Sequence, residues 1–85
     1  MTITLRFFAS VREALGTSQE TLALPDGVAT VGDLRRHLLL RGGAWAQALS
    51  SERALRMAYN QVMCDAGQVL EDGAEVAFFP PVTGG

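Results

Sequence analysis

The sequence predicts a single α+β domain in which a mixed β-sheet packs against one main helix. Segments that alternate between apolar and polar residues lie toward both ends of the chain, a longer segment with helical spacing lies between them, and turn-forming residues separate the segments. At 85 residues the chain has room for one hydrophobic core. We expect the domain to span residues 1–79 and an extended tail to span residues 80–85.

The N-terminal residues predict a half-buried strand followed by a short helical turn. Residues 2–8 alternate strictly, and the side chains expected to face the core are those of Ile3, Leu5 and Phe7. Residues 9–16 then predict a helical turn, with Ser10 as its N-terminal cap and Gly16 as its end.

A second strand and the main helix are predicted next. Residues 19–24 favour a strand, and residues 25–27 (Pro-Asp-Gly) favour a turn. Thr30 and Asp33 have the spacing of a capping box and open the main helix, which Gly42-Gly43 is expected to end. The apolar face of this helix consists of Val31, Leu34 and Leu38. Its polar face, expected to point mainly toward water, consists of Arg35, Arg36 and His37.

A short helix and a hairpin are predicted after the main helix. Residues 44–50 favour the helix, in which Trp45 and Leu49 are four positions apart. Two strands at residues 55–59 and 62–64 are joined by a tight turn at Asn60-Gln61, since asparagine tolerates the left-handed backbone that such turns require.

The last predicted elements are a loop and a strand. Residues 68–73 form a loop that ends in an Asp-Gly turn, and residues 75–79 form the final strand. Pro80-Pro81 ends this strand, because proline has no N–H to donate to a sheet. The order of elements resembles the β-grasp fold of ubiquitin, in which the first and last strands lie side by side and parallel in the middle of the sheet.

The composition excludes several classes of protein. The chain is 48% apolar, carries a net charge of −2 and contains one cysteine. This excludes a disordered tail and an internal disulfide framework, and it argues against a nucleic-acid partner, which would require clustered positive charge. The sequence contains neither an apolar run long enough to cross a membrane nor a signal-peptide pattern. We therefore expect a cytoplasmic protein.

The usual catalytic residues are isolated in the sequence. His37 is the only histidine and falls on the polar face of the main helix, and Cys64 has no second cysteine or nearby histidine. Turns or caps account for Asp26, Asp33, Asp65 and Asp72. We expect no metal site and no cofactor bound by the chain itself, and we expect that the chain does not act as an enzyme on its own. All seven basic residues are arginine, so the chain offers no lysine as a nucleophile or as an acceptor of another chain.

The C-terminal segment is the most informative part of the sequence. Pro80 and Pro81 hold the chain in a stiff extended form after the last strand, and Val82, Thr83, Gly84 and Gly85 follow them. The stretch from Pro81 to Gly85 can span about 16 Å, enough to enter the channel of another protein. A channel can close tightly on two glycines, which have no side chains. The terminal carboxylate is then a chemical handle that becomes reactive once another enzyme activates it, for instance as an acyl-adenylate.

Strand parity predicts a second functional feature, a hydrophobic docking surface. Phe8 and Phe79 are both out of phase with the core-facing residues of their strands, so they should lie together on the outer face of the sheet. Of the adjacent Val62 and Met63, one should also face outward, and Met63 is the expected residue. Exposed aromatic residues beside methionine are typical of a surface that binds a partner.

Two segments give the chain a family resemblance. Leu5-Arg-Phe-Phe-Ala-Ser-Val-Arg-Glu13 near the start and Asp72-Gly-Ala-Glu-Val-Ala-Phe-Phe-Pro-Pro-Val-Thr-Gly-Gly85 at the end resemble the small, sulfur-carrying subunits of molybdopterin synthase. The similarity runs the length of the chain and includes the start of the helix at Thr30, Trp45 and the Asn60-Gln61 turn. Residues 40–51 are less diagnostic.

The resemblance implies a role in molybdenum cofactor biosynthesis. An ATP-dependent adenylyltransferase of the ubiquitin-activating type would adenylate Gly85, and sulfur would then convert it to a thiocarboxylate. The tail, from Pro80 through Val82 and Thr83 to Gly84 and Gly85, would enter the large synthase subunit and deliver sulfur to cyclic pyranopterin monophosphate. In this family two small subunits flank a dimer of large subunits, the acid–base residues belong to the large subunit, and the hydrophobic contact maps onto Phe8, Met63 and Phe79.

Other functions remain open on the sequence alone. Sulfur carriers for the thiamin thiazole ring, for cysteine or for tRNA thiolation share the fold and the terminal glycines, although the Phe-Phe-Pro-Pro segment favours the pterin pathway. A protein modifier attached through Gly85 to lysines of its targets, or an interaction module with incidental glycines, would belong to different functional classes.

Overall fold

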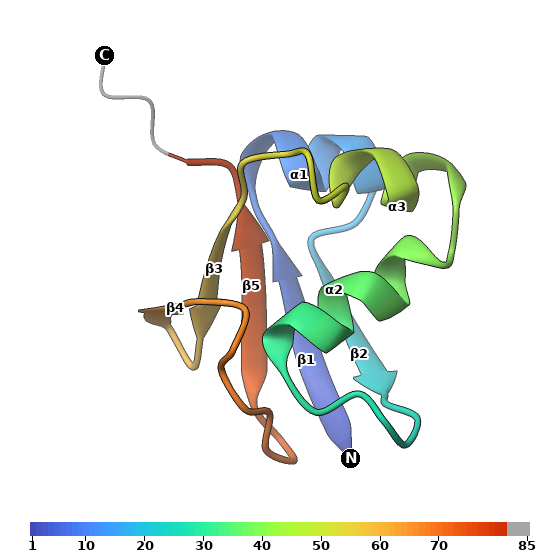
Figure 1. The fold of residues 1–85 in the computed structure, drawn as a ribbon. Helices are drawn as coiled ribbons and strands as arrows, with labels where there is room; N and C mark the ends of the chain where they lie inside the picture. Colours follow the sequence, from blue (N-terminus) through green and yellow to red (C-terminus); the bar gives the residue numbers. More distant parts are fainter. Residues whose placement is uncertain (82–85) are drawn as a thin grey trace.

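A computed structural model describes residues 1–81 of the chain. Its elements follow the predicted order, and Figure 1 shows helices on one side of a twisted sheet. The five strands are β1 (Thr2–Phe7), β2 (Gln19–Ala23), β3 (Arg56–Tyr59), β4 (Val62–Cys64) and β5 (Glu75–Phe79). The three helices are α1 (Ala9–Leu15), α2 (Val31–Leu39) and α3 (Gly43–Ala48).

The sheet has the strand order β2-β1-β5-β3-β4 and is mixed. β1 and β5 run parallel in its middle, with Thr4 opposite Glu75 and Phe7 opposite Phe78, and the other neighbours are antiparallel. The predicted β-grasp architecture is thereby confirmed. The parallel pair places the first and last strands side by side at the centre of the sheet, while the N-terminus and the start of the tail lie at opposite ends of it (Figure 1).

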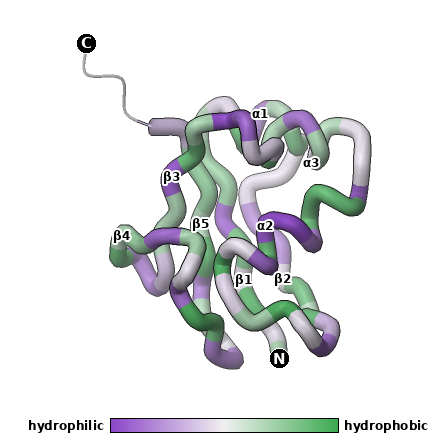
Figure 2. The backbone as a smooth tube through the Cα atoms, in the orientation of Figure 1, coloured by the Kyte–Doolittle hydropathy of each residue, from purple (hydrophilic) through white to green (hydrophobic). Residues whose placement is uncertain are grey.

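The core lies between the sheet and α2. The alternating residues of β1 face it as predicted, and Ile3, Leu5 and Phe7 are at most 1% exposed. Strands β1 and β5, helix α2 and the residue that follows α3 contribute the largest fully buried side chains, which are Phe7, Phe78, Ile3, Leu5, Leu34, Leu38, Leu49, Val31 and Val76. Figure 2 shows the same pattern as apolar segments along β1 and β5. Leu70, predicted in a loop, also lies in the core at 5% exposure.

The main helix begins as the sequence predicts and ends earlier. The Thr30 hydroxyl accepts a hydrogen bond from the Asp33 N–H, and the Asp33 carboxylate accepts one from the Thr30 N–H, each at 3.1 Å, which completes the capping box. At the other end, α2 stops at Leu39 and not at Gly42-Gly43. The N–H groups of Leu40, Arg41 and Gly42 bond to carbonyls three residues back, so the last turn tightens before the glycines are reached.

The start of α1 and the polar face of α2 correct two predictions. Phe8 occupies the cap position of α1 in an extended conformation, without a side-chain hydrogen bond, so Ser10 is not the cap. Arg35 does not point freely toward water. Its guanidinium is half-buried and donates hydrogen bonds to the backbone carbonyls of Leu49, Ser50 and Arg53. It thereby anchors the segment between α3 and β3.

The hairpin and the short helix agree with prediction. Asn60 and Gln61 both have positive φ, 48° and 69°, as a tight hairpin turn requires. Trp45 of α3 packs edge-on against Phe7 at a centroid distance of 5.5 Å, and the Arg41 guanidinium lies 4.3 Å from the Trp45 ring centre. None of the helices within residues 1–81 is long and apolar enough to span a membrane.

Candidate functional site

The predicted tail begins at the end of the sheet toward which β1 and β5 both point. Pro80 and Pro81 follow β5 and are half-buried. Because β5 lies between β1 and β3, the chain leaves from the middle of the sheet (Figure 1). The remaining predicted tail residues, Val82, Thr83, Gly84 and Gly85, lie outside the described residues. The structure therefore defines the root of the predicted tail and its surroundings.

Phe8 and Phe79 come together at this root. Parallel pairing of β1 with β5 sets Phe7 opposite Phe78, and the Phe8 N–H donates a hydrogen bond of 3.3 Å to the Phe78 carbonyl. The two outward rings then meet edge to face, with centroids 6.4 Å apart and an angle of 85° between their planes. Phe8 remains 41% exposed and Phe79 is half-buried.

Met63 lies on the same face of the sheet. It is opposite Ala58, and Ala58 is opposite Ala77, so the three side chains project to the side on which Phe79 lies. Met63 is 56% exposed, whereas Ala58 and Ala77 are at most 8% exposed. We call Phe8, Met63 and Phe79 the outer patch. The two buried alanines form a low apolar floor between its aromatic and methionine ends.

The edge strand exposes one apolar residue that parity did not predict. Val62 alternates to the side of the helices, yet it is 69% exposed because β4 is the outermost strand. Figure 2 shows β4 as an apolar segment at the sheet edge. A position at the edge of a sheet cannot be deduced from alternation alone.

Arginines border the outer patch. The Arg6 guanidinium lies 5.4 Å from the Phe8 ring centre and 3.6 Å from the Glu75 carboxylate. Arg56 begins β3 directly opposite Phe79 and is exposed. The patch is therefore apolar at its centre, with the paired Arg6 and the exposed Arg56 at its rim.

A groove lies on the helical side of the tail root. It has a volume of about 470 Å³ and is lined by α1, α3, the segment before β3 and both prolines. Small side chains such as Ala14, Ala44 and Ala48 leave space in the groove, and Arg53 is also one of its lining residues. We call it the exit groove. The Arg35 guanidinium donates a hydrogen bond of 3.1 Å to the Arg53 carbonyl and so holds the backbone of this lining residue in place.

The metal-ligating residue types are scattered over the described part of the chain. No group of three or more potential metal ligands occurs among residues 1–81. Cys64 is partly buried at the end of β4, and desolvation, together with the nearby Asp65 charge, raises the pKa of its thiol. A raised pKa makes the thiol a poor nucleophile at neutral pH.

Arginine–carboxylate pairs elsewhere have structural roles. Arg41 donates to Glu20, with one nitrogen–oxygen distance of 2.9 Å, and this hydrogen bond lowers the pKa of Glu20. Hydrogen bonds from the Ala29 and Thr30 N–H groups, opposed by desolvation, lower the pKa of Asp33. Glu20 thereby joins β2 to the segment after α2, and Asp33 caps the start of α2.

Comparisons with known proteins show relatives that are similar to this chain in sequence and in fold. The ThiS family model matches residues 5–85. A curated molybdopterin synthase sulfur carrier subunit of Escherichia coli is 45% identical over 98% of this chain and 99% of its own, and one of Haemophilus influenzae is 42% identical over 93% and 94%. The crystal structure of H. volcanii small archaeal modifier protein 1 has 27% identity and a TM-score of 0.73, covering 95% of this chain and 98% of its own.

Proposed function

Because the chain belongs to the ThiS family, we propose that it is the sulfur carrier subunit of a molybdopterin synthase and carries sulfur on Gly85. The observation that supports this most strongly is the 42–45% identity, over nearly the whole chain, to curated sulfur carrier subunits of that synthase. The corresponding handle in this proposal is the Gly84-Gly85 pair that follows Pro80-Pro81-Val82-Thr83.

In this proposal the terminal carboxylate is first activated. A ubiquitin-activating-type adenylyltransferase joins it to AMP with ATP as the donor, and pyrophosphate leaves. Sulfide then attacks the carbonyl carbon, a C–S bond forms, the C–O bond to AMP breaks, and Gly85 becomes a thiocarboxylate. The chain itself holds neither ATP nor a metal ion, and the reaction takes place in the cytoplasm, where the activating enzyme has access to ATP.

Transfer of the sulfur requires a second partner. The outer patch binds the large synthase subunit, while Pro80 and Pro81 direct Val82, Thr83, Gly84 and Gly85 into its active site. There the thiocarboxylate sulfur forms a C–S bond with cyclic pyranopterin monophosphate in place of oxygen, and water cleaves the bond between that sulfur and the Gly85 carbonyl, which returns Gly85 to a carboxylate. Two such transfers supply the two sulfurs of the dithiolene, and acid–base residues of the large subunit move the protons. Two small subunits flank a central dimer of large subunits in the proposed assembly.

The outer patch supports this docking role because of its position. It lies at the root of the tail, so a protein that binds the patch is held where it can receive the tail. Its aromatic and methionine side chains are partly exposed around a floor of buried alanines. Such surfaces bury apolar area on association and thus supply the binding free energy that positions the reacting terminus.

A protein modifier is the second candidate function. The similarity to small archaeal modifier protein 1 favours it, since that structure shares the fold at a TM-score of 0.73. A modifier would form an amide between Gly85 and lysines of target proteins. Carriers of sulfur to a thiazole or to tRNA belong to the same chemical class as the main proposal and differ from it in the acceptor.

Intact-mass measurement tests the proposal. The chain is incubated with ATP, its adenylyltransferase and a sulfur donor, beside a control that lacks Gly85. We expect one oxygen atom to be exchanged for sulfur in the full chain alone. The thiocarboxylated chain is then mixed with the large subunit and cyclic pyranopterin monophosphate, and a dithiolene product is expected.

Each alternative has its own result in the same experiment. A full chain that remains unchanged beside a demonstrably active adenylyltransferase contradicts the sulfur-carrier role. A thiocarboxylate that sulfurates a thiazole precursor and leaves the pterin unchanged assigns a different pathway. Adducts of high mass that depend on Gly85 in cell lysate support the modifier.

A further inference from the structure

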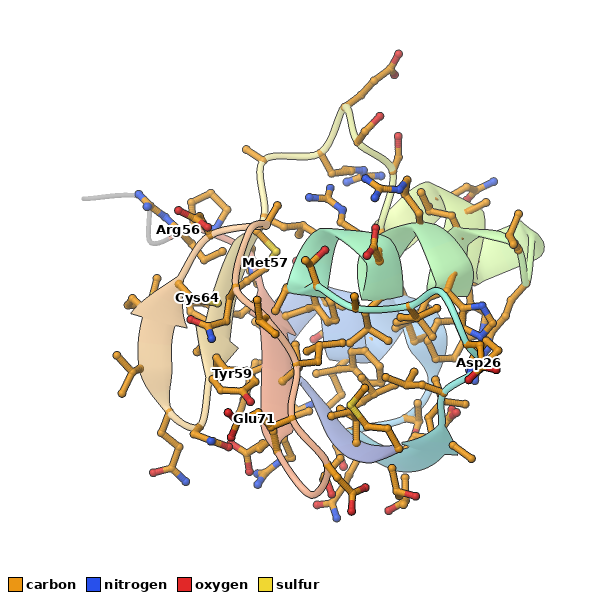
Figure 3. All side chains as sticks on the ribbon, turned by 60° about the horizontal axis from the view of Figure 1, so that its bottom comes forward. Asp26, Arg56, Met57, Tyr59, Cys64 and Glu71 are labelled. Carbon is orange, nitrogen blue, oxygen red and sulfur yellow. The ribbon has the colours of Figure 1, made fainter. Side chains whose placement is uncertain are left out.

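Two exposed arginines border the root of the tail from different sides. Arg56 is opposite Phe79, so its side chain projects from the outer face of the sheet. Arg53 lines the exit groove together with Pro80 and Pro81, on the side of the helices. Figure 3 shows Arg56 at the end of β3 that is remote from Tyr59 and Glu71.

Neither arginine is neutralised by a carboxylate within residues 1–81. The ion pairs of this part of the chain engage Arg6, Arg36 and Arg41. Arg35 is occupied by backbone carbonyls, as described above. Even Glu52, adjacent to Arg53 in the sequence, forms no ion pair with it in the described structure.

The positive charge at the root contrasts with the rest of the molecule. The chain has a net charge of −2, and three of its acidic residues, Glu71, Asp72 and Glu75, lie near the opposite end of β5. There Glu71 donates its N–H to the Tyr59 hydroxyl at 2.9 Å, and Asp72 accepts the Thr2 N–H at 2.7 Å. A partner that approaches the root on the outer face therefore meets Arg56, and one that approaches the exit groove meets Arg53.

The short reach of the tail brings any processing partner close to these arginines. Beyond Pro81 the chain has four residues, which span about 13 Å when extended. A protein that encloses Gly85 in an active site must therefore come up to the root itself. Covering a guanidinium removes its hydration, and this cost is recovered only if the covering surface supplies an acceptor, best of all a carboxylate.

We propose that Arg53 and Arg56 form a cationic collar that binds carboxylate side chains at the rim of the channel by which the large synthase subunit receives the tail. The inference rests on the proposed function and adds the chemistry of the partner surface. Arg56 extends the outer patch with a charged contact, and the exit groove gives a carboxylate beside Arg53 room to enter. Such pairs select partners and accelerate association, and salt weakens them.

Binding of the large subunit to matched charge variants tests the collar. The double variant Arg53→Gln/Arg56→Gln removes two positive charges at the root. The control Ala23→Glu/Gln61→Glu adds two negative charges at exposed positions at the other end of the sheet, so both variants have the same net charge. Affinity is measured by calorimetry for the full chains at 0.05 M and 0.3 M NaCl, after thermal unfolding has shown that all are folded.

We expect the root variant to bind about tenfold more weakly than the wild type at low salt, and its affinity to depend less on salt. The control should stay within about twofold of the wild type. Equal affinities of root variant and wild type overturn the collar, as does an equal loss in the control, which would trace the effect to net charge. A wild-type chain that does not bind the large subunit at either salt concentration overturns the proposed function as well.

Discussion

The Phe8–Phe79 contact links two ends of the sequence on the surface that we propose for docking. Each ring is held by its neighbour at a centroid distance of 6.4 Å, so neither has to be ordered on binding. We predict that Phe79→Ala weakens binding of the large subunit by about 1–3 kcal/mol, because an aromatic anchor next to the tail root is lost. Calorimetry with the purified subunits measures the change.

Thr21→Ala is the matched control for this substitution. Thr21 is exposed on β2 and lies on the same face of the sheet, two strands from Phe79. Its replacement should leave the affinity unchanged. If Phe79→Ala and Thr21→Ala bind equally well, the outer patch is not the docking surface.

At the scale of single residues, the sequence predicted side-chain direction better than side-chain contact. The alternation of β1 and β5 was sufficient to place Phe8 and Phe79 on one face, because strand parity is strict. The contacts of Arg35 could not be predicted, since its three acceptor carbonyls follow in the chain by 14 to 18 residues and become neighbours only when α3 folds back. The positive φ of Ala9, 50°, could not be predicted from the sequence, because alanine rarely adopts this conformation.

Among the elements, α2 depends most clearly on a local sequence motif. The Thr30 hydroxyl satisfies the Asp33 N–H, one of the backbone donors that a helix start leaves unpaired. We predict that Thr30→Ala lowers the free energy of unfolding by about 1 kcal/mol. Urea unfolding measures this change. Ser51→Ala, at an exposed position outside the helices, is the control, and a loss of the same size there would contradict the capping role.

The same cap predicts a dependence of stability on pH. The Ala29 and Thr30 N–H groups lower the pKa of Asp33 in the folded state. A carboxyl group whose pKa falls on folding stabilises the protein above its unfolded pKa of about 3.9, and this contribution is lost as the pH falls through the lower folded value. We therefore expect the stability difference between wild type and Asp33→Asn to shrink below about pH 4 in urea titrations. A difference that stays constant with pH would contradict this account.

The ends of the elements were harder to predict than their existence. Turn chemistry at Asn60-Gln61 depends on two adjacent residues, and the structure confirms it. The end of α2 depends on which carbonyl each backbone N–H bonds to. At Leu40, Arg41 and Gly42 the N–H donates to the carbonyl three residues back, which ends the α-helix. Serine is a common N-cap residue, yet the turn that follows β1 places Phe8, and not Ser10, at the cap position of α1.

For the whole molecule, the structure separates the part that provides stability from the part that we propose reacts. The fully buried core extends as far as Phe78, and the chain after Phe79 contributes no residue to it within the described range. We predict that deletion of Gly84 and Gly85 abolishes formation of the thiocarboxylate and leaves the melting temperature within about 1 °C of the wild type. Scanning calorimetry and intact mass measure the two properties. A large fall in melting temperature would contradict the proposed boundary at residue 79.

The parallel contact between β1 and β5 also sets the order of events during synthesis. The hydrogen bond from Thr2 to Asp72 spans 70 residues, and the central strands are paired over a similar separation. Such a fold has a high contact order, so closing the sheet is slow compared with forming its helices. Since translation starts at the N-terminus, β1 must wait for β5 to leave the ribosome before it can acquire its central neighbour. A nascent chain that stops before β5 therefore remains open to proteases, and the chains that survive as folded protein are those that have been translated at least to the root of the tail.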